Sequence, residues 1–230
     1  MSPLLTITNL NKIYHRHQPD EVIALRDISL KITAGEVVAL TGPSGSGKTT
    51  LLSLLGCMSK PTSGSIQLRG RLVSKLPERF LAQIRRTSFG FVFQQYNLLR
   101  DVSVLENVML PLYPSNQSFR VMKKTAGAVL ERFELQKMMR KKVKQLSGGE
   151  QQRVAIARAL VANPDIIIAD EPTAHLDSNL SEILLGILAN LNTEGKTIII
   201  ATHDPAIYQS PLIQRRVSLR HGEIVEDKNQ

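Results

Sequence analysis

The residues from Gly42 to Thr49 have the types and spacing that bind phosphate groups. They read Gly-Pro-Ser-Gly-Ser-Gly-Lys-Thr and fit the pattern G-x-x-x-x-G-K-[ST]. Glycines let a backbone wrap around phosphate, so that successive amide groups and the positive end of a following helix face the anion. Lys48 would reach the β and γ phosphates, and the hydroxyl of Thr49 would bind magnesium. This loop therefore predicts a site for a nucleoside triphosphate and Mg²⁺.

Two adjacent carboxylates, Asp170 and Glu171, follow the apolar run at 166–169. Neighbouring side chains at the end of a strand point in opposite directions. Asp170 is therefore predicted to help hold magnesium, and Glu171 to polarise the attacking water. An acidic turn after a core strand would look the same, but the phosphate-binding loop upstream favours the catalytic interpretation.

A second anion-binding pattern lies at 146–153, far along the chain from the first, in Leu-Ser-Gly-Gly-Glu-Gln-Gln-Arg. Ser147 can cap the helix that follows, while Gly148 and Gly149 leave its first amide groups exposed. One nucleotide rarely needs two such sites. The residues alone do not say what the second one binds.

Strands and helices must position these residues. Apolar alternation or apolar runs predict strands at 4–10, 22–32, 37–40, 89–93, 166–169 and 197–201, with a hairpin through 66–73. Helical spacing predicts helices at 49–58, within 101–135, after Ser147 and at 179–191. Strand, crossover helix and strand in this order predict an α/β fold with its ligand at the carboxyl ends of the strands.

Composition sets wider limits. The 230 residues are 42% hydrophobic, which is enough for one sizeable core. The single cysteine, Cys57, fits a reducing compartment, and the first residues do not read as a secretory signal, so we expect a cytoplasmic protein. No run approaches the roughly 20 apolar residues of a membrane-spanning helix. The net charge of +9 would suit binding to nucleic acid, to an anionic membrane surface or to a polyphosphate ligand, and it does not distinguish among these partners.

Taken together, the motifs at 42–49, 146–153 and 170–171 resemble those of the ATP-binding cassettes, over about residues 5–225. The blocks at 42–58, 89–99 and 104–112 resemble the lipoprotein-release and macrolide-exporter branch. The resemblance implies a P-loop NTPase core with a mostly parallel sheet, an N-terminal antiparallel β-subdomain and an all-helical insert that holds the second motif. It implies one domain over 1–230, with the core and β-subdomain at about 1–93 and 164–230 and the helical insert at about 95–163.

The resemblance also implies roles for individual residues. His203, after the strand at 197–201, would contact the γ-phosphate and orient Glu171, so these two form the catalytic pair. The implied ATP-binding residues are Tyr14, Gly42, Pro43, Ser44, Gly45, Ser46, Gly47, Lys48, Thr49, Thr50 and Gln94. Magnesium would be held by Thr49, Gln94 and Asp170. Ser147, Gly148, Gly149 and Asp177 would bind the ATP of a second subunit, because family members form head-to-tail dimers.

The function implied is that of an ATP hydrolase subunit of a membrane exporter, held at the cytoplasmic face of the membrane by a permease partner. That partner would dock between Gln94 and the insert, around 97–112. A regulatory cassette that signals to a membrane partner without transport is the alternative. DNA-repair and translation cassettes, and hence nucleic acid, do not fit the short separation between Lys48 and Ser147. Two residues depart from the pattern of the family. Glu150 stands where many members have glutamine, and its side chain is expected to point away from the nucleotide. His175, in the loop at 173–177 that ends in Asp177, stands where a small residue or asparagine is more usual.

Overall fold

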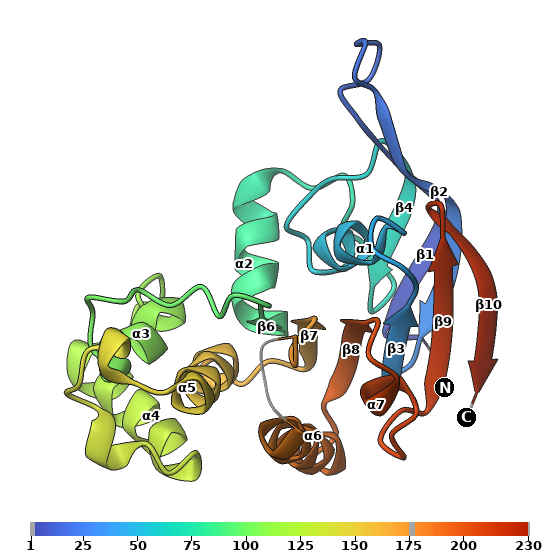
Figure 1. The fold of residues 1–230 in the computed structure, drawn as a ribbon. Helices are drawn as coiled ribbons and strands as arrows, with labels where there is room; N and C mark the ends of the chain where they lie inside the picture. The colour runs from blue at the N-terminus through green and yellow to red at the C-terminus, as the bar shows by residue number, and fades with distance from the viewer. Residues whose placement is uncertain (1–2, 175–177, 230) are drawn as a thin grey trace.

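A six-stranded, mostly parallel sheet forms the centre of the protein (Figure 1). The computed structural model describes residues 3–174 and 178–229. Within them the strand order is β10-β9-β3-β8-β7-β6, and only the β9–β10 pair is antiparallel. The strands are β3 (Val37–Thr41), β6 (Phe89–Val92), β7 (Ile166–Asp170), β8 (Thr197–Thr202), β9 (Arg215–Arg220) and β10 (Glu223–Asn229).

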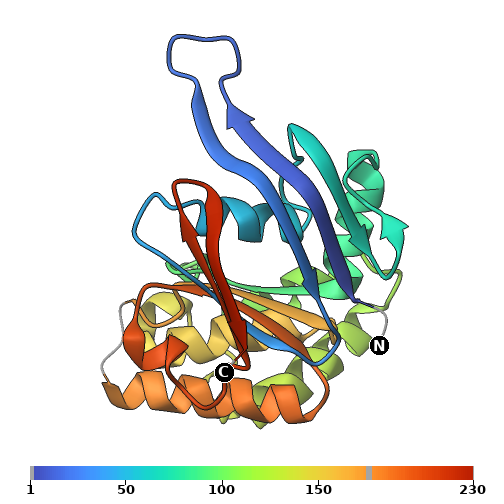
Figure 2. The same ribbon diagram turned by 90° about the vertical axis from the view of Figure 1, so that its right-hand side faces the viewer.

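A second, antiparallel sheet has the order β2-β1-β4-β5. Its strands are β1 (Leu5–Tyr14), β2 (Val22–Ile32), β4 (Ser63–Leu68) and β5 (Arg71–Leu72). The tip of the β1–β2 hairpin extends beyond the rest of the molecule (Figure 2). The hairpin nevertheless brings Tyr14, at the end of β1, opposite Val22 at the start of β2.

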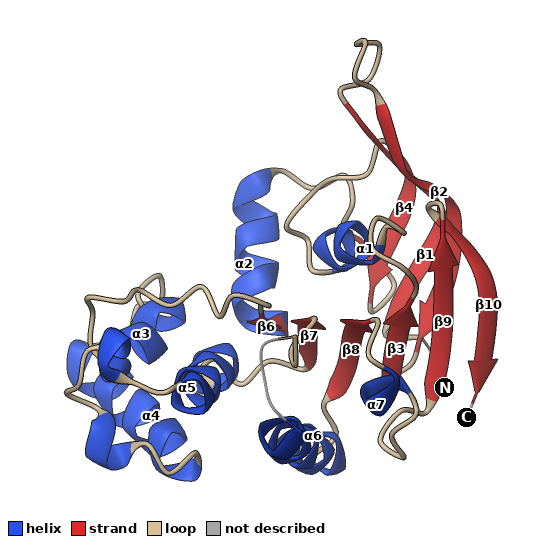
Figure 3. Ribbon diagram, in the orientation of Figure 1, coloured by secondary structure: helices blue, strands red, loops and turns tan. Residues whose placement is uncertain are grey.

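Helices lie on both faces of the central sheet and beside it (Figure 3). The α-helices are α1 (Lys48–Leu55), α2 (Glu78–Ser88), α3 (Val104–Met109), α4 (Phe119–Arg132), α5 (Gly148–Leu160), α6 (Ser178–Thr193) and α7 (Pro205–Tyr208). Short 3-10 turns follow at Leu110–Leu112, Gln136–Met138 and Val143–Gln145. Helices α3, α4 and α5 gather beside β6, on the side away from the antiparallel sheet (Figure 1). They make up the predicted helical insert.

Two hydrophobic cores lie on opposite faces of the six-stranded sheet. Successive residues of a strand point to opposite faces, so β8 gives Ile198 and Ile200 to one core and Ile199 to the other. The first core continues into α3, α4, α5 and α6, and the second into α1 and the antiparallel sheet. Both faces of these strands are therefore buried, which explains why they read as continuous apolar runs.

The predicted fold class is confirmed, and the structure adds elements that the sequence pattern did not predict. Helix α2 buries only Leu81 and is polar on average, so it lacks the broad apolar face of a core helix. Strands β9 and β10 are rich in charge, and their cations pair with acids: Arg215 with Glu36 and Asp227, and Arg216 with Glu226. Among the residues that the structure describes, no helix is long and apolar enough to cross a membrane.

Candidate functional site: a phosphate-binding cleft and a second anion motif

Three strands of the central sheet end at one edge and deliver the predicted site residues there. Strand β3 leads into Gly42, β7 into Glu171, and β8 into His203. The register places Thr41 beside Thr202 and Asp170 beside Ala201, so the three strand ends are level. The carboxyl edge of a parallel sheet is where α/β proteins bind ligands.

The loop after β3 has a shape that only glycine permits at two positions. Gly42 has φ 143°, and a Cβ there would lie 2.2 Å from the carbonyl oxygen of Leu219. Gly47 has φ 103°, and a Cβ there would lie 2.7 Å from the carbonyl oxygen of Ala24. Both contacts are with backbone, which cannot move aside as a side chain can. The close packing of this loop on its neighbours therefore fixes its curvature before any ligand binds.

Lys48 is buried at the start of α1 with its ammonium group turned into the loop. Nζ donates to the carbonyl oxygens of Gly42, at 2.7 Å, and Pro43, at 3.1 Å. It also lies 3.8 Å from Oε1 of Glu171. Near it, the hydroxyl oxygen of Ser46 is buried without a hydrogen-bond partner in the described part of the chain. A buried polar atom without a partner is costly, so a phosphate oxygen within this loop would satisfy it.

Thr49 and Asp170 meet across the cleft between α1 and β7. The Thr49 hydroxyl donates to Oδ1 of Asp170 at 3.2 Å. Burial raises the pKa of Asp170, the hydrogen bond from Thr49 opposes that rise, and the nearby charge of Glu171 adds to it. A cation bound beside these two oxygens would favour the ionised carboxylate. Both groups are hard oxygen donors of the kind that Mg²⁺ prefers.

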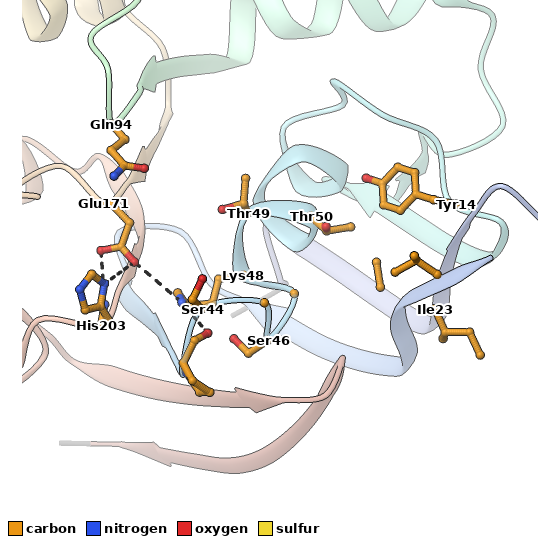
Figure 4. Close-up of a pocket in the computed structure, with 15 residues that line it drawn as sticks. Tyr14, Ile23, Ser44, Ser46, Lys48, Thr49, Thr50, Gln94, Glu171 and His203 are labelled. Carbon is orange, nitrogen blue, oxygen red and sulfur yellow. Dashed lines mark hydrogen bonds and ion pairs between the residues drawn. The ribbon is translucent and has the colours of Figure 1, made fainter. Parts of the chain in front are cut away.

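Glu171 is held in an unusual backbone conformation at the end of β7. Its φ is 44°, in the left-handed region, and its amide donates to the carbonyl of Ala201 at 2.9 Å. Oε1 of the carboxylate lies 2.8 Å from Nδ1 of His203, and Oε2 accepts from the His203 amide at 3.4 Å (Figure 4). Non-glycine residues with positive φ persist only where surrounding contacts require them. The carboxylate is thus fixed between an imidazole and an ammonium group.

One cleft, with a volume of about 560 Å³, connects these groups. Its lining residues are Tyr14, Val22, Ile23, Ala24, Gln94, Glu171, His203 and the loop from Pro43 to Thr50. Figure 4 shows Tyr14 and Ile23 at one end and Gln94, Glu171 and His203 at the other, with the loop between them. Its apolar end suits a planar ring, its middle suits phosphates, and its charged end suits an attacking water.

Gln94 lies in the exposed turn after β6 and is tied indirectly to the second anion motif. Arg158, on α5, donates to the carbonyl oxygens of Asn97 and Tyr96, at 2.5 and 2.6 Å, in the segment that follows Gln94. Gln152, also on α5, donates to the carbonyl of Pro172 at 2.6 Å, directly after Glu171. Helix α5 is therefore hydrogen-bonded to the backbone on both sides of the cleft's charged end.

Ser147 caps the start of α5, as the sequence predicted. Its Oγ accepts from the amide of Glu150 at 3.4 Å, and the Glu150 carboxylate accepts from the Ser147 amide at 2.7 Å. The expectation that Glu150 points away is therefore refined: its side chain folds back onto the helix start. A Cβ on Gly149 would lie 2.7 Å from Leu180, whereas Gly148 faces open space. Asp177 and His175 lie outside the described residues.

Within one chain the structure does not bring Ser147 to the cleft, because none of the residues at 146–150 lines it. Val22, Ile23 and Ala24 do line it, although sequence reasoning did not select them. The hairpin register places the exposed side chains of Val22 and Ile23 opposite Tyr14 and Ile13, and the sequence pattern alone does not give that register. The contacts of Gln152 and Arg158 had no sequence signal, since both are ordinary polar positions of an amphipathic helix.

Comparison with known proteins identifies the family. Residues 25–174 match the family described as ABC transporter. This chain belongs to the ABC transporter family. The macrolide export ATP-binding/permease protein MacB of Pectobacterium atrosepticum is 43% identical over 225 residues, which are 98% of this chain and 34% of that protein. The MacB of Hyphomonas neptunium is 44% identical over the same shares. The chain therefore spans about a third of the length of the curated relatives it matches.

Solved structures agree with this ABC transporter assignment. The dimeric structure of MJ0796, described as a bacterial ABC transporter cassette, matches with a TM-score of 0.88 and 41% identity over 98% of both chains. MJ0796 in a post-hydrolysis state bound to ADP and Pi matches with a TM-score of 0.88 and 40% identity. The predicted family and fold are confirmed, and the chain is an ATPase cassette that binds ATP.

Proposed function

We propose that two copies of this cassette close head to tail on two ATP molecules, and that the closure drives export by a membrane permease. The single observation that supports the hydrolytic part is the position of Glu171, fixed between His203 and Lys48 at the charged end of the cleft. The full-length MacB relatives are named as export ATP-binding/permease proteins, which supports a membrane partner for this chain. We place the cassette at the cytoplasmic face of that membrane.

The cleft would bind ATP with the base at its apolar end. Tyr14 is 38% exposed, and Val22 and Ile23 are exposed beside it, so all three have free apolar surface to stack on a ring. The loop amides, the Ser46 hydroxyl and Lys48 would then receive the phosphates. Lys48 would exchange its contacts with two carbonyl oxygens for contacts with phosphate oxygens, which are charged and bind an ammonium more strongly.

Magnesium would be held by Thr49, Gln94 and Asp170. In the described residues there is no group of three or more His, Cys, Asp and Glu side chains that could hold a metal ion. Phosphate oxygens and water would therefore complete the coordination shell, which is the usual arrangement for Mg²⁺. The ion would neutralise charge on the phosphates during transfer.

Glu171 would act as the general base toward the attacking water. Its carboxylate is 13% exposed, and one oxygen already contacts His203. The imidazole at Oε1 and the longer contact of the His203 amide with Oε2, at 3.4 Å, hold the carboxylate in one orientation, and the second lone pair of Oε2 would accept from water. Because Lys48 lies 3.8 Å from Glu171, phosphate binding at Lys48 and water activation at Glu171 occur side by side.

The second anion motif would complete the site of a second copy. The Ser147 oxygen accepts one hydrogen bond, so its hydroxyl proton remains free to donate to phosphate. Gly148 and Gly149 would present their amides beside it. Asp177 is proposed to cross the same interface. This arrangement explains why one chain has two anion motifs that do not meet within it.

The bounds of the core and of the helical insert are part of this proposal. We propose one domain in which residues 95–163 form a lobe on the core at 1–93 and 164–230, with the permease docked near 97–112. The hydrogen bonds from Arg158 to the segment after Gln94 would transmit the state of the cleft to that surface. The same helix begins at Ser147, so docking and dimer closure would be coupled.

Turnover should depend on protein concentration if the complete site needs two copies. The rate of ATP hydrolysis per subunit should rise with concentration and then level off, because dimers form by mass action. A coupled phosphate-release assay over a hundredfold range of concentration measures this. A rate per subunit that stays constant while the chain remains a monomer would contradict the two-copy site.

Replacing Asp170 with Asn should raise the Mg²⁺ concentration needed for half-maximal turnover by about 10–100-fold, since an amide oxygen lacks the carboxylate charge. Asp165→Asn is the matched control, because Asp165 lies near the other end of β7 and its side chain contacts Arg69. Titration of turnover with MgCl₂ compares the two. Equal Mg²⁺ requirements in both variants would remove Asp170 from the metal site.

A further inference from the structure

A buried amide on α5 is hydrogen-bonded to the backbone directly after the proposed base. Gln152 is 3% exposed, and its Nε2 donates to the carbonyl oxygen of Pro172 at 2.6 Å. Pro172 is itself buried, and it follows Glu171 in the chain. The amide therefore holds the backbone beside the cleft without lining the cleft itself.

Gln152 differs in character from the other side chains that α5 buries. Those belong to apolar residues or glycine, such as Gly149, Val154 and Leu160. A buried amide is costly unless it is hydrogen-bonded, and an apolar residue would fill the same space without that cost. The bond with Pro172 gives this position a physical reason to be polar.

Two local preferences oppose the backbone conformation of Glu171. Its φ of 44° lies in the left-handed region, which non-glycine residues rarely adopt. The next residue is Pro172, and the ring of a proline favours extended backbone in the residue before it. Without outside contacts this backbone would relax toward the extended conformation and turn the carboxylate in another direction. Contacts from neighbouring elements must therefore hold it in place.

These contacts come from both sides of Glu171. Its amide donates to the carbonyl of Ala201 on β8 at 2.9 Å, and its carbonyl accepts from the amide of Ala174 at 3.2 Å. Pro172 has no amide proton, so its carbonyl is the one backbone group through which it can be hydrogen-bonded. Gln152 donates to that group. It is thus the side chain that ties the strained turn to α5.

We propose that Gln152 is a positioning residue for ATP hydrolysis. By holding the Pro172 carbonyl, it keeps Glu171 in the strained conformation that directs the carboxylate to water. This inference rests on the proposed function, in which Glu171 is the general base. Because Gln152 does not line the cleft, it acts on the chemical step only through Glu171. The phosphate contacts of Lys48 do not depend on it.

The position of Gln152 on α5 also connects the two anion motifs. It follows Ser147 by about one and a half turns, or roughly 7–8 Å along the helix axis. The capping box of Ser147 and Glu150 fixes the first turn of the helix, and Gln152 lies in the next. A phosphate of the partner bound at Ser147 would therefore act on Pro172 through one short stretch of helix. Closure of the two copies would position the base of each.

Replacing Gln152 with Met tests the proposal, because Met has a similar size and helix propensity but cannot donate a hydrogen bond. The variant should lower kcat by about 10–100-fold, since small displacements of a catalytic group have effects of this size. The affinity for ATP, measured with a fluorescent analogue, should stay the same. Gln152→Asn repeats the test with polarity kept, because its shorter amide falls short of the carbonyl.

Asn192→Leu is the matched control. The Asn192 amide also donates to a backbone carbonyl, that of Gly35 at 2.7 Å, but it lies near the amino-terminal ends of β3 and β8, away from the cleft. Thermal unfolding should show a comparable loss of stability in this variant and in Gln152→Met. The control should keep the turnover of the wild type.

A double variant separates positioning from a general effect on folding. In the Glu171→Gln background the base is absent, so Gln152→Met should lower the remaining turnover by less than about twofold. Equal losses of turnover in the two backgrounds, a normal kcat in the single variant, or a loss of ATP affinity that matches the loss of kcat would each overturn the positioning role. Normal turnover in Glu171→Gln alone would instead refute the base assigned under the proposed function, and this inference with it.

Discussion

Replacing Glu171 with Gln should lower the rate of ATP turnover by about 100-fold or more, because an amide cannot accept the proton of the attacking water. ATP binding should persist. Gln is nearly the same size and can keep a hydrogen bond with His203, while Lys48 and the loop remain unchanged. Since hydrolysis would then be blocked, ATP should hold the two copies closed. Phosphate release measures turnover, and equilibrium binding of a fluorescent ATP analogue measures affinity.

Glu131→Gln is the control for this change, because Glu131 is an exposed acid on α4. It should leave turnover within about twofold of the wild type, as surface substitutions usually do. Normal turnover in the Glu171 variant would remove this residue as the base. Loss of ATP binding in that variant would instead mean that its charge serves mainly to position Lys48.

Replacing Ser147 with Arg should abolish dimer formation and hydrolysis while leaving ATP binding by the monomer largely intact. The long cation would fill the space in which the partner's phosphate must approach the start of α5. It would also remove the cap, at a cost of about 1 kcal/mol in the free energy of unfolding. That loss is small beside the stability of a domain of this size. Size-exclusion chromatography with ATP and a turnover assay measure both effects.

Ser118→Arg is the control that separates the loss of a helix cap from the block at the dimer interface. Ser118 is exposed and caps α4, where its side chain accepts from the amide of Val121 at 3.4 Å. This control adds the same charge and removes a similar cap, so it should have a similar effect on stability and no effect on dimer formation. If Ser147→Arg abolished ATP binding by the monomer, the second anion motif would belong to the site of its own chain.

The central strands could be predicted because burial on both faces produces uninterrupted apolar runs. Predicted strands at 37–40, 166–169 and 197–201 became β3, β7 and β8, with ends that differ by one residue. The runs end in polar residues at the sheet edge, so the position of the candidate site could be predicted from the same signal. The glycine pattern at 42–49 then required the curvature that Gly42 and Gly47 show.

Elements held by charge could not be predicted in this way. In β9, Arg215 binds both Glu36 and Asp227, and these partners are distant in sequence or lie across a turn. The sequence Arg-Arg-Val-Ser-Leu-Arg of β9 gives no sign of those partners. Helix α2 was missed because its composition is polar on average and Leu81 is its one buried residue. In each case tertiary contacts stabilise the element.

In the candidate site, too, some features could be predicted from local sequence and others depend on tertiary contacts. The roles of residues within 42–49 followed from local pattern, whereas the contact of Glu171 with His203 depends on two strands placed side by side. The apolar wall of Val22 and Ile23 depends on the register of a hairpin. The proposed contact of Ser147 with nucleotide lies between copies, and no reading of one chain can locate it. Resemblance to dimeric relatives was needed for that step.

Measurement of mass in the presence of ATP tests the two-copy site most directly. The chain has a mass of 25.5 kDa. By light scattering, Glu171→Gln with ATP should have twice that mass and contain two ATP per dimer, and adding Ser147→Arg to it should restore the monomer with ATP still bound. A Glu171→Gln protein that saturates with ATP as a monomer, or a double variant that still dimerises, would contradict the two-copy site.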